Sequence, residues 1–313
     1  MIDALRDLFK QNYWVIALVL GVLLIGFPCV TMEKDHWTAH PPNTWVPVAI
    51  GIALLIVSVS AYGFNLWTKR AKDAEVGAGL DLTRVRDTNG ARWTIVNGCE
   101  IRVIEGRLED HSPGAGTVVV LPCNEYFDDR CAGDVKSALG AYVNRQFEGQ
   151  EEDFISLLRE ESKRKLGPGE VQQKTNDERA ESFGPGRCVL LLKPLNRSVP
   201  VALVSTTTQR AGEGLAARIS YLFSGTRELV SKLADARLTE VVMPILGGGH
   251  GRIDPPLALV GLLLAISEAA RYGQGGQRLR SVTIVVFKRD SVTPPEVDRV
   301  VVRRALALIG SRD

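Results

Sequence analysis

The chain has 313 residues, of which 45% are hydrophobic and 24% are charged. That apolar share is too high for a disordered chain. Because 38 Lys and Arg stand against 36 Asp and Glu, the chain lacks the basic excess of a nucleic-acid-binding protein, and we expect no nucleic-acid partner. The length allows one large domain or two ordinary ones, and the first 68 residues differ from the rest.

Two uncharged runs stand close together near the N-terminus, at residues 11–32 and 41–68. Each is long enough to cross a bilayer as a helix and is rich in residues that favour insertion. Tryptophans lie at or near the ends of the runs, where an aromatic belt sits: Trp14, Trp37, Trp45 and Trp67. Acidic residues near the start disfavour a cleaved signal peptide, and two buried core helices remain the alternative. We predict a transmembrane hairpin of two helices over residues 1–68.

The basic residues that flank the two runs predict the orientation of this hairpin. They are Arg6 and Lys10 before the first run, Lys34 between the runs, and Lys69, Arg70 and Lys72 after the second. By the positive-inside rule, both termini should be cytoplasmic in a multi-pass protein of the inner cell membrane. Neither run holds a charged residue, which argues against the ionic site of a transporter. Small residues four apart, such as Ala17 and Gly21, permit self-association.

Histidine and cysteine give no convincing metal site. His36 and His40 have the spacing of a helical metal pair, but two Pro follow and no third ligand is obvious. The five Cys are odd in number and show no CxxC spacing, and four of them fall in the part assigned to the reducing cytoplasm. We therefore expect free thiols in a core, no disulfide framework and no metal.

Residues 69–92 are polar with scattered Gly, and we interpret them as a linker to a domain over 93–313. Short apolar runs predict strands at 93–96, 101–104, 117–121, 188–192, 201–205, 240–246 and 281–287. Amphipathic stretches predict helices at 134–147, 152–165, 216–236, 257–272 and 296–309. This alternation favours a three-layer α/β/α domain. The highly charged segment 148–182 is expected to be an insertion, a lid or a partly mobile excursion outside the core.

The most informative stretch is a glycine-rich loop between the strand predicted at 240–246 and the helix predicted at 257–272. Its residues are Gly247, Gly248, Gly249, His250, Gly251 and Arg252. Such a loop before a helix offers backbone N–H groups and the positive end of the helix dipole to an anion, and the absence of Cβ atoms lets a diphosphate approach. Arg252 adds a charge-assisted donor. The loop fits neither a Walker motif nor G-x-G-x-x-G, and a merely tight turn remains the alternative.

A second polar loop follows the strand predicted at 117–121 and runs through Asn124, Phe127, Asp128 and Asp129. The Asn124 side chain can both donate and accept hydrogen bonds, and the two aspartates can accept from ribose hydroxyls or from a ligand amine. Alternatively, the aspartates cap the helix that follows or place negative charge at its N-terminus.

With these two loops, the chain resembles the macro domains that bind ADP-ribose, over most of the segment from about Trp93 to Phe287. The strand followed by Asn124 is similar to the family's first ligand loop, and ILGGGHGR is similar to its phosphate loop. Further similar stretches are LPCNEYFDD, FGPGRCVLL and ALVSTTTQ, the last of which contains Thr206 and Thr207. The resemblance implies a three-layer α/β/α fold with a mixed sheet. It also implies that Phe287, at the end of the last apolar strand, could stack on adenine, although a plain core Phe is equally compatible.

The sequence also departs from the family pattern. The first loop has one Asn where two are usual, the glycine run before the next helix is reduced to Gly133, and the acidic residue expected after an early Gly is replaced by Arg107 after Gly106. These losses weaken hydrolysis of ADP-ribose esters more than binding, so we expect a sensor without catalytic residues. His250 is then a ligand contact rather than a general base.

Together with the two predicted spans, the whole chain is similar to membrane-anchored macro-domain effectors of type II Thoeris anti-phage systems. That resemblance implies an ADP-ribose-derived ligand made by a TIR-domain protein, self-association, and disruption of the inner membrane, with no resident cofactor. A membrane-anchored ADP-ribosyl hydrolase is the alternative function, and a static anchor that recruits an ADP-ribosylated partner is a third.

Overall fold

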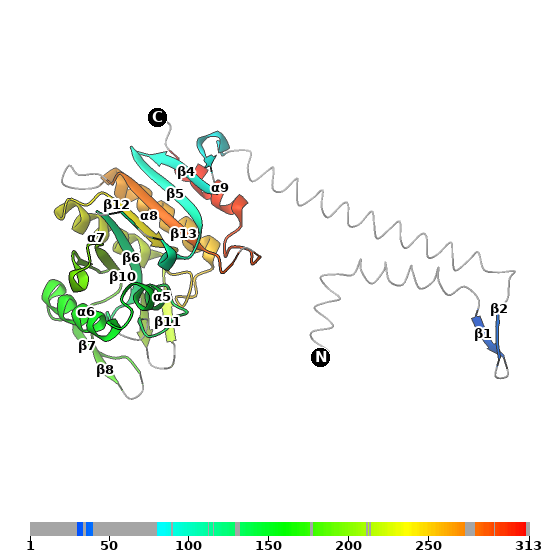
Figure 1. Ribbon diagram of the computed structural model, residues 1–313, viewed down its shortest axis with the longest axis horizontal. Coiled ribbons are helices and arrows are strands. Elements are labelled where there is room, and N and C mark those ends of the chain that lie inside the picture. The colour runs from blue at the N-terminus through cyan, green and yellow to red at the C-terminus, as the bar shows by residue number, and fades with distance from the viewer. Residues whose placement is uncertain are drawn as a thin grey trace. The chain divides into compact units, whose positions relative to one another are not determined.

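A computed structural model of the chain describes residues 30–33, 36–39, 80–88, 90–111, 113–114, 116–128, 132–175, 178–210, 212, 214–272, 279–290 and 292–310 (Figure 1). The chain divides into two compact units, residues 1–79 and 80–313. In the first unit, the described residues form an antiparallel hairpin of β1 (Val30–Glu33) and β2 (His36–Ala39).

The predicted transmembrane spans lie almost entirely outside the described residues and stay a prediction. Residues 30–32, at the end of the first uncharged run, are extended in β1, where the β-branched Val30 and Thr31 pair with Ala39 and Thr38. His36 lies on strand β2, so its spacing to His40 is not helical there, and His40 itself is outside the described residues. Across the part of the chain that the structure describes, no helix combines the length and the apolarity needed to cross a bilayer.

The second unit is built on a nine-stranded sheet with the order β11-β10-β6-β12-β13-β5-β4-β3, and β9 also pairs with β10. The five central strands, from β10 to β5, are parallel to their neighbours, and the outer strands are antiparallel. The strands are β3 (Arg86–Thr88), β4 (Ala91–Val96), β5 (Cys99–Gly106), β6 (Thr117–Asn124), β9 (Cys188–Leu191), β10 (Val201–Arg210), β11 (Gly214–Ala217), β12 (Glu240–Pro244) and β13 (Ser281–Phe287). The sheet is therefore mixed.

Helices cover both faces of this sheet. The helices are α5 (Ala138–Gln146), α6 (Glu151–Leu166), α7 (Ile219–Asp235), α8 (Pro255–Tyr272) and α9 (Arg299–Ile309). Side chains of β6 alternate between two cores: Val118 and Val120 pack with residues of α7, α8 and α9, whereas Val119 and Leu121 pack with residues of α5 and α6. The predicted three-layer α/β/α arrangement of a mixed sheet is confirmed.

The unit begins earlier than the predicted boundary at residue 93. Leu80 and Leu82 pack against the larger core, and the short helix η1 (Leu82–Arg84) precedes strand β3. The linker predicted over 69–92 therefore ends sooner than expected. All three residues of β3 are exposed, so an apolar pattern could not reveal a strand that is held by pairing with β4.

The charged segment 148–182 contains helix α6 and a separate hairpin of β7 (Glu170–Gln173) and β8 (Arg179–Ser182). Figure 1 shows this hairpin next to α6 at one end of the unit. The expectation that the segment stays outside the core is wrong for α6, because Phe154 and Leu158 are fully buried. Two apolar residues four positions apart are enough to seat one face of an otherwise charged helix.

Candidate functional site

A cleft opens where the parallel strands β6, β10 and β12 end. Because these strands run in the same direction, the loops at their carboxyl ends meet at one edge of the sheet. The cleft has a volume of about 90 Å³. It is lined by Pro122, Cys123, Lys136, Ser137, Ala138, Thr206, Thr207, Leu215, Ile245, Gly247, Gly249, His250 and Gly251.

The loop between β12 and α8 has backbone N–H groups that donate to no acceptor in the described part of the protein. Three of its carbonyl groups accept hydrogen bonds: Ile253 N–H donates to the Gly247 oxygen at 3.2 Å, Arg252 N–H to the Gly249 oxygen at 3.0 Å, and Ala217 N–H to the Gly251 oxygen at 2.9 Å. Within the described part of the chain, the N–H groups of residues 247–251 donate to no protein acceptor. A rigid loop with five such donors suits an anion.

The glycines of this loop are present for different structural reasons. Gly247 has φ +80°, a conformation that favours glycine. A Cβ at Gly251 would lie 2.7 Å from the Gly247 oxygen and 2.7 Å from the Ala217 Cβ, so close packing requires a glycine there. A Cβ at Gly249 would meet nothing within 4 Å. Gly249 is thus free of structural demands, and its lack of a side chain keeps the edge of the cleft open.

Strand β10 contributes a buried hydroxyl to the cleft. Its pairing with β6 shifts register between Ser205 and Thr207, so the strand is irregular at Thr206. Thr206 is 1% exposed, and within the described residues its Oγ1 has no hydrogen-bond partner. Its neighbour Thr207 donates from Oγ1 to the Cys123 oxygen at 3.4 Å. A buried hydroxyl without a partner is costly and points to a group that the protein itself does not supply.

The start of α5 also borders the cleft, where Lys136, Ser137 and Ala138 line it. Ser137 caps this helix by accepting a hydrogen bond from Gly140 N–H at 2.8 Å, so the helix begins at Ala138 and not at Asp134 as predicted. Across the cleft, the His250 Nε2 lies 3.0 Å from Asp134 Oδ2, which joins the glycine loop to the segment before α5. Sequence reasoning missed Lys136, Ser137 and Asp134 as site residues, although a Ser before an apolar run is a recognisable cap signal.

Asn124 and Asp128 have structural partners instead of facing the cleft. The Asn124 Nδ2 donates to Asp128 Oδ1 at 2.9 Å, and the Asn124 Oδ1 accepts from Tyr126 N–H at 3.0 Å. The Asp128 carboxylate also forms an ion pair with Lys174. Both side chains are buried. They shape the first loop, and neither belongs to the lining of the cleft.

The remaining predicted site residues lie in different surroundings. Phe127 is fully buried and packs edge-on against Phe183, with ring centroids 6.0 Å apart, so it belongs to the core. Gly248 and Arg252 belong to the glycine loop but do not line the cleft. Phe287 is 45% exposed at the end of β13, and Asp129 is outside the described residues. The structure thus brings together Thr206, Thr207, Gly247, Gly249, His250 and Gly251.

Solved structures with a similar fold include several macrodomains. One from Oceanobacillus iheyensis with MES bound has a TM-score of 0.47 and 11% identity, over 70% of this chain and 95% of that one. The macrodomain of Thermus aquaticus DarG has a TM-score of 0.38 and 17% identity, over 59% and 97% of the two chains. A Trypanosoma brucei macrodomain in complex with ADP-ribose has a TM-score of 0.39 and 16% identity, over 59% and 63%. No protein-family model and no curated protein matches the chain.

Proposed function

We propose that residues 80–313 form a macro-type domain that binds an ADP-ribose derivative in the cleft between β6, β10 and β12. One observation carries this proposal: within the described residues, the N–H groups of residues 247–251 have no protein acceptor, and four of these residues line a cleft that also holds the unpartnered hydroxyl of Thr206. A diphosphate offers only acceptor oxygens at neutral pH, so it matches this set of donors. The sequence resemblance in both loops supports ADP-ribose as the molecule that carries the diphosphate.

The cleft itself has room for a small part of such a ligand. A volume of about 90 Å³ suits the phosphate groups and not a whole dinucleotide, so the nucleoside parts extend along the adjoining surface. The open position of Gly249 gives the diphosphate its approach, and Thr206 supplies a hydroxyl from β10, where the neighbouring Thr207 hydroxyl already donates to the Cys123 oxygen. Lys136 and Ser137 border the same space and are placed to meet a group attached to the ligand.

We further propose that the chain is a membrane-anchored effector of bacterial anti-phage defence of the type II Thoeris kind. In this proposal a TIR-domain protein makes the nucleotide signal, binding favours a self-associated state, and the two uncharged runs then disrupt the inner membrane. Ligand binding can drive assembly only through a difference in affinity between the two states. A hundredfold preference for the assembled form would supply about 2.7 kcal/mol per protomer.

A membrane-anchored ADP-ribosyl hydrolase is the second candidate, and the contact between His250 and Asp134 favours it. A carboxylate 3.0 Å from the imidazole Nε2 orients the ring beside the cleft, as for a general base. The two candidates differ in the fate of the ligand. A sensor releases ADP-ribose conjugates intact, whereas a hydrolase converts them over many turnovers, and chromatography after incubation separates these outcomes.

The binding proposal is tested with Gly249→Val in the full-length chain, titrated calorimetrically with ADP-ribose. The valine side chain has space within the fold but narrows the approach to the N–H groups, so we expect at least a tenfold loss of affinity and an unchanged thermal midpoint. Gly114→Val is the matched control, because a Cβ at that exposed glycine also meets nothing within 4 Å. Equal affinity of both variants and the unmodified chain would remove the phosphate-loop assignment.

A further inference from the structure

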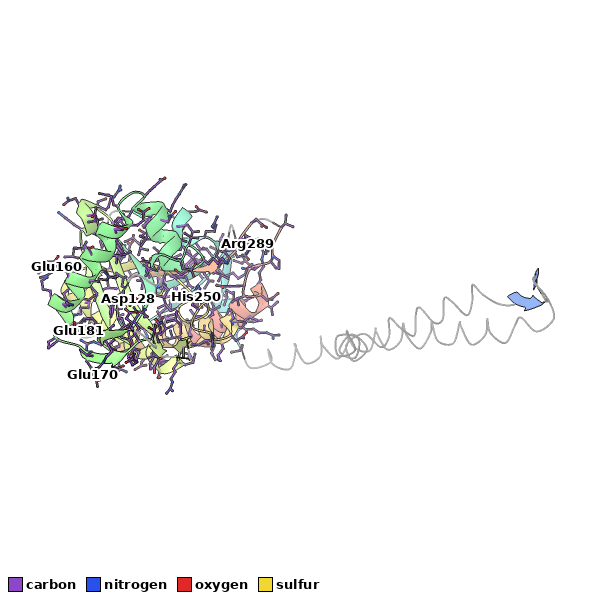
Figure 2. The ribbon with its side chains drawn as sticks, turned by 90° about the horizontal axis from the view of Figure 1, so that it is seen from below. Asp128, Glu160, Glu170, Glu181, His250 and Arg289 are labelled. Atoms are coloured by element: carbon purple, nitrogen blue, oxygen red, sulfur yellow. The ribbon has the colours of Figure 1, made fainter. Side chains whose placement is uncertain are left out.

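The hairpin of β7 and β8 delivers a buried cation to the first loop. Lys174, directly after β7, is only 3% exposed. A lysine is rarely buried so deeply unless its charge is paired. Its Nζ forms an ion pair with the Asp128 carboxylate and lies 3.2 Å from Glu178 Oε1. It also lies 5.6 Å from the centroid of the Tyr126 ring. Figure 2 shows Asp128 within the body of the unit, whereas Glu170 of β7 lies at its margin.

From Lys174, a chain of polar contacts leads to the cleft. Asp128, held by Lys174, accepts the hydrogen bond of Asn124 at 2.9 Å. Asn124 is the last residue of β6 and pairs with Thr207 of β10, which lines the cleft together with Cys123, the neighbour of Asn124. The position of the Asp128 carboxylate therefore fixes the end of β6, and with it one wall of the cleft.

A second set of contacts ties the other end of the hairpin to the same loop. The buried Glu125 accepts from Ser182 Oγ at 3.1 Å and from Gln209 N–H at 3.1 Å. Phe183 N–H donates to the Glu125 backbone oxygen at 2.9 Å. Because both ends of the hairpin are attached to residues 124–128, the hairpin and the loop hold each other in place.

We infer that Lys174 is a positioning residue for the ligand cleft, acting through Asp128 and Asn124. This inference deepens the proposed function and rests on it, because it assigns the charged β7–β8 segment a part in binding ADP-ribose. Removing the ammonium alone leaves a buried carboxylate without this counter-ion, which favours turning Asp128 toward water. Removing both charges relieves that penalty and leaves the Asn124 contact possible.

The test compares three variants of the full-length chain in detergent, titrated with ADP-ribose. Lys174→Met should weaken binding at least tenfold. The double variant Lys174→Met with Asp128→Asn should restore affinity to within about threefold, because the side-chain amide oxygen that Asp128→Asn introduces can still accept from Asn124. The control is Lys163→Met, which removes an exposed lysine of the neighbouring α6 that lies 3.6 Å from Glu181 of β8. This variant should bind as the unmodified chain does.

If Lys174 only stabilised the fold, the double variant would not recover affinity for ADP-ribose. Recovery of affinity therefore supports the positioning role. Unchanged affinity in Lys174→Met overturns the inference, and so does equal loss in the single and double variants when both keep the thermal midpoint. If Lys174→Met does not fold, the double variant alone decides, because weak binding by the folded double variant also overturns it.

If the unmodified chain does not bind ADP-ribose, the proposed function fails, and hydrogen exchange then decides the inference separately. Amide exchange at residues 123–128 should be faster in Lys174→Met and should return to the original rate in the double variant. Equal exchange rates in all of these chains would contradict the positioning role.

Discussion

Single atoms explain why the glycine loop contains so many glycines. Gly251 is surrounded closely enough that a Cβ would lie 2.7 Å from a backbone oxygen, whereas Gly249 has open space around it. Gly251 is therefore required for close packing, whereas Gly249 leaves the edge of the cleft open. The same residue type fulfils two needs that the sequence cannot separate, because both appear only as the letter G.

This difference gives a prediction about stability. Gly251→Ala should lower the free energy of unfolding by about 1–3 kcal/mol, because the loop must shift to admit the methyl group. Gly249→Ala should stay within about 0.5 kcal/mol of the unmodified chain. Chemical denaturation of the two variants measures both values. Equal stability of the two would show that the loop adapts to a side chain at either position.

Buried thiols provide a second prediction at this scale. Cys99, Cys123 and Cys188 are free and buried, as expected for the described cysteines. Burial raises the pKa of the Cys99 thiol to about 12 and raises that of Cys188 as well. Because the thiolate is the reactive form, neither residue should be alkylated by iodoacetamide at pH 8 until denaturant is added. Mass spectrometry of the native protein checks this, and rapid labelling of Cys188 would contradict its burial.

The sequence located half of the cleft because glycines and threonines at the ends of apolar strands form a local pattern. It could not show that Asn124 and Asp128 are occupied with each other and with Lys174. Lys174, which pairs with Asp128, comes from the β7–β8 hairpin, and a polar side chain looks the same in a sequence whether it faces a ligand or a buried lysine. Long-range pairing decides between these roles, and periodicity carries no information about it.

At the scale of elements, Glu105 links three parts of the unit. Its carboxylate at the end of β5 accepts from Arg299 of α9 at 2.7 and 3.0 Å and from Lys288 after β13 at 3.2 Å. The hydrogen bonds from Arg299, followed by those from Lys288, lower the pKa of Glu105. A depressed pKa in the folded state means that the stabilisation is fully present above the unfolded glutamate pKa of about 4.3 and is lost as the pH falls through the lower folded value.

Glu105→Gln should therefore flatten the loss of stability below about pH 4.3. At neutral pH the variant should be less stable than the unmodified chain, and the two should converge in acid. Thermal midpoints measured from pH 7 to pH 3 follow this convergence. A constant difference between the two chains across that range would mean that Glu105 does not titrate differently in the folded state.

Elements differed in how well the sequence predicted them. All seven predicted strands and all five predicted helices are present, because each buries a recognisable apolar face. The sequence did not predict β1 and β2 of the first unit. In the second unit, strands β3, β7, β8 and β11 were missed. They have three or four residues each and bury at most one of them, so their stability comes from hydrogen bonds to a neighbouring strand and not from an apolar pattern.

At the scale of the whole molecule, the boundary at Leu80 predicts which fragment is complete. A fragment that begins at Leu80 should unfold at the same temperature as residues 80–313 do in the full chain. A fragment that begins at Trp93 should be markedly less stable, because it lacks β3, the packing of Leu80 and Leu82, and the hydrogen bond from Arg84 to the Gly310 oxygen at 3.0 Å. Calorimetric scans of both fragments measure the difference.

The same fragment tests the effector proposal. If recognition and membrane damage reside in separate parts of the chain, the fragment from Leu80 should bind ADP-ribose as the full chain does and release no dye from liposomes. The full-length chain should release dye only when ligand is added, because uncharged hairpins insert stably without forming an aqueous path. Equal release with and without ligand, over a range of protein densities, would leave the N-terminal runs as a simple anchor.

The contact between Arg84 and Gly310 also bears on how residues 80–313 respond to force applied where the chain enters them. Arg84 fastens the first helical turn of the unit to the end of its last helix, and β3 continues directly into the edge of the sheet. Force applied at residue 80 would therefore act first on η1, α9 and β3. Strands β6, β10 and β12 lie further along the sheet. We therefore expect force applied at residue 80 to reach this edge of the sheet before it reaches the cleft. If the N-terminal runs do anchor the chain, we expect crowding or rotation of that anchor to leave binding in the proposed cleft unchanged.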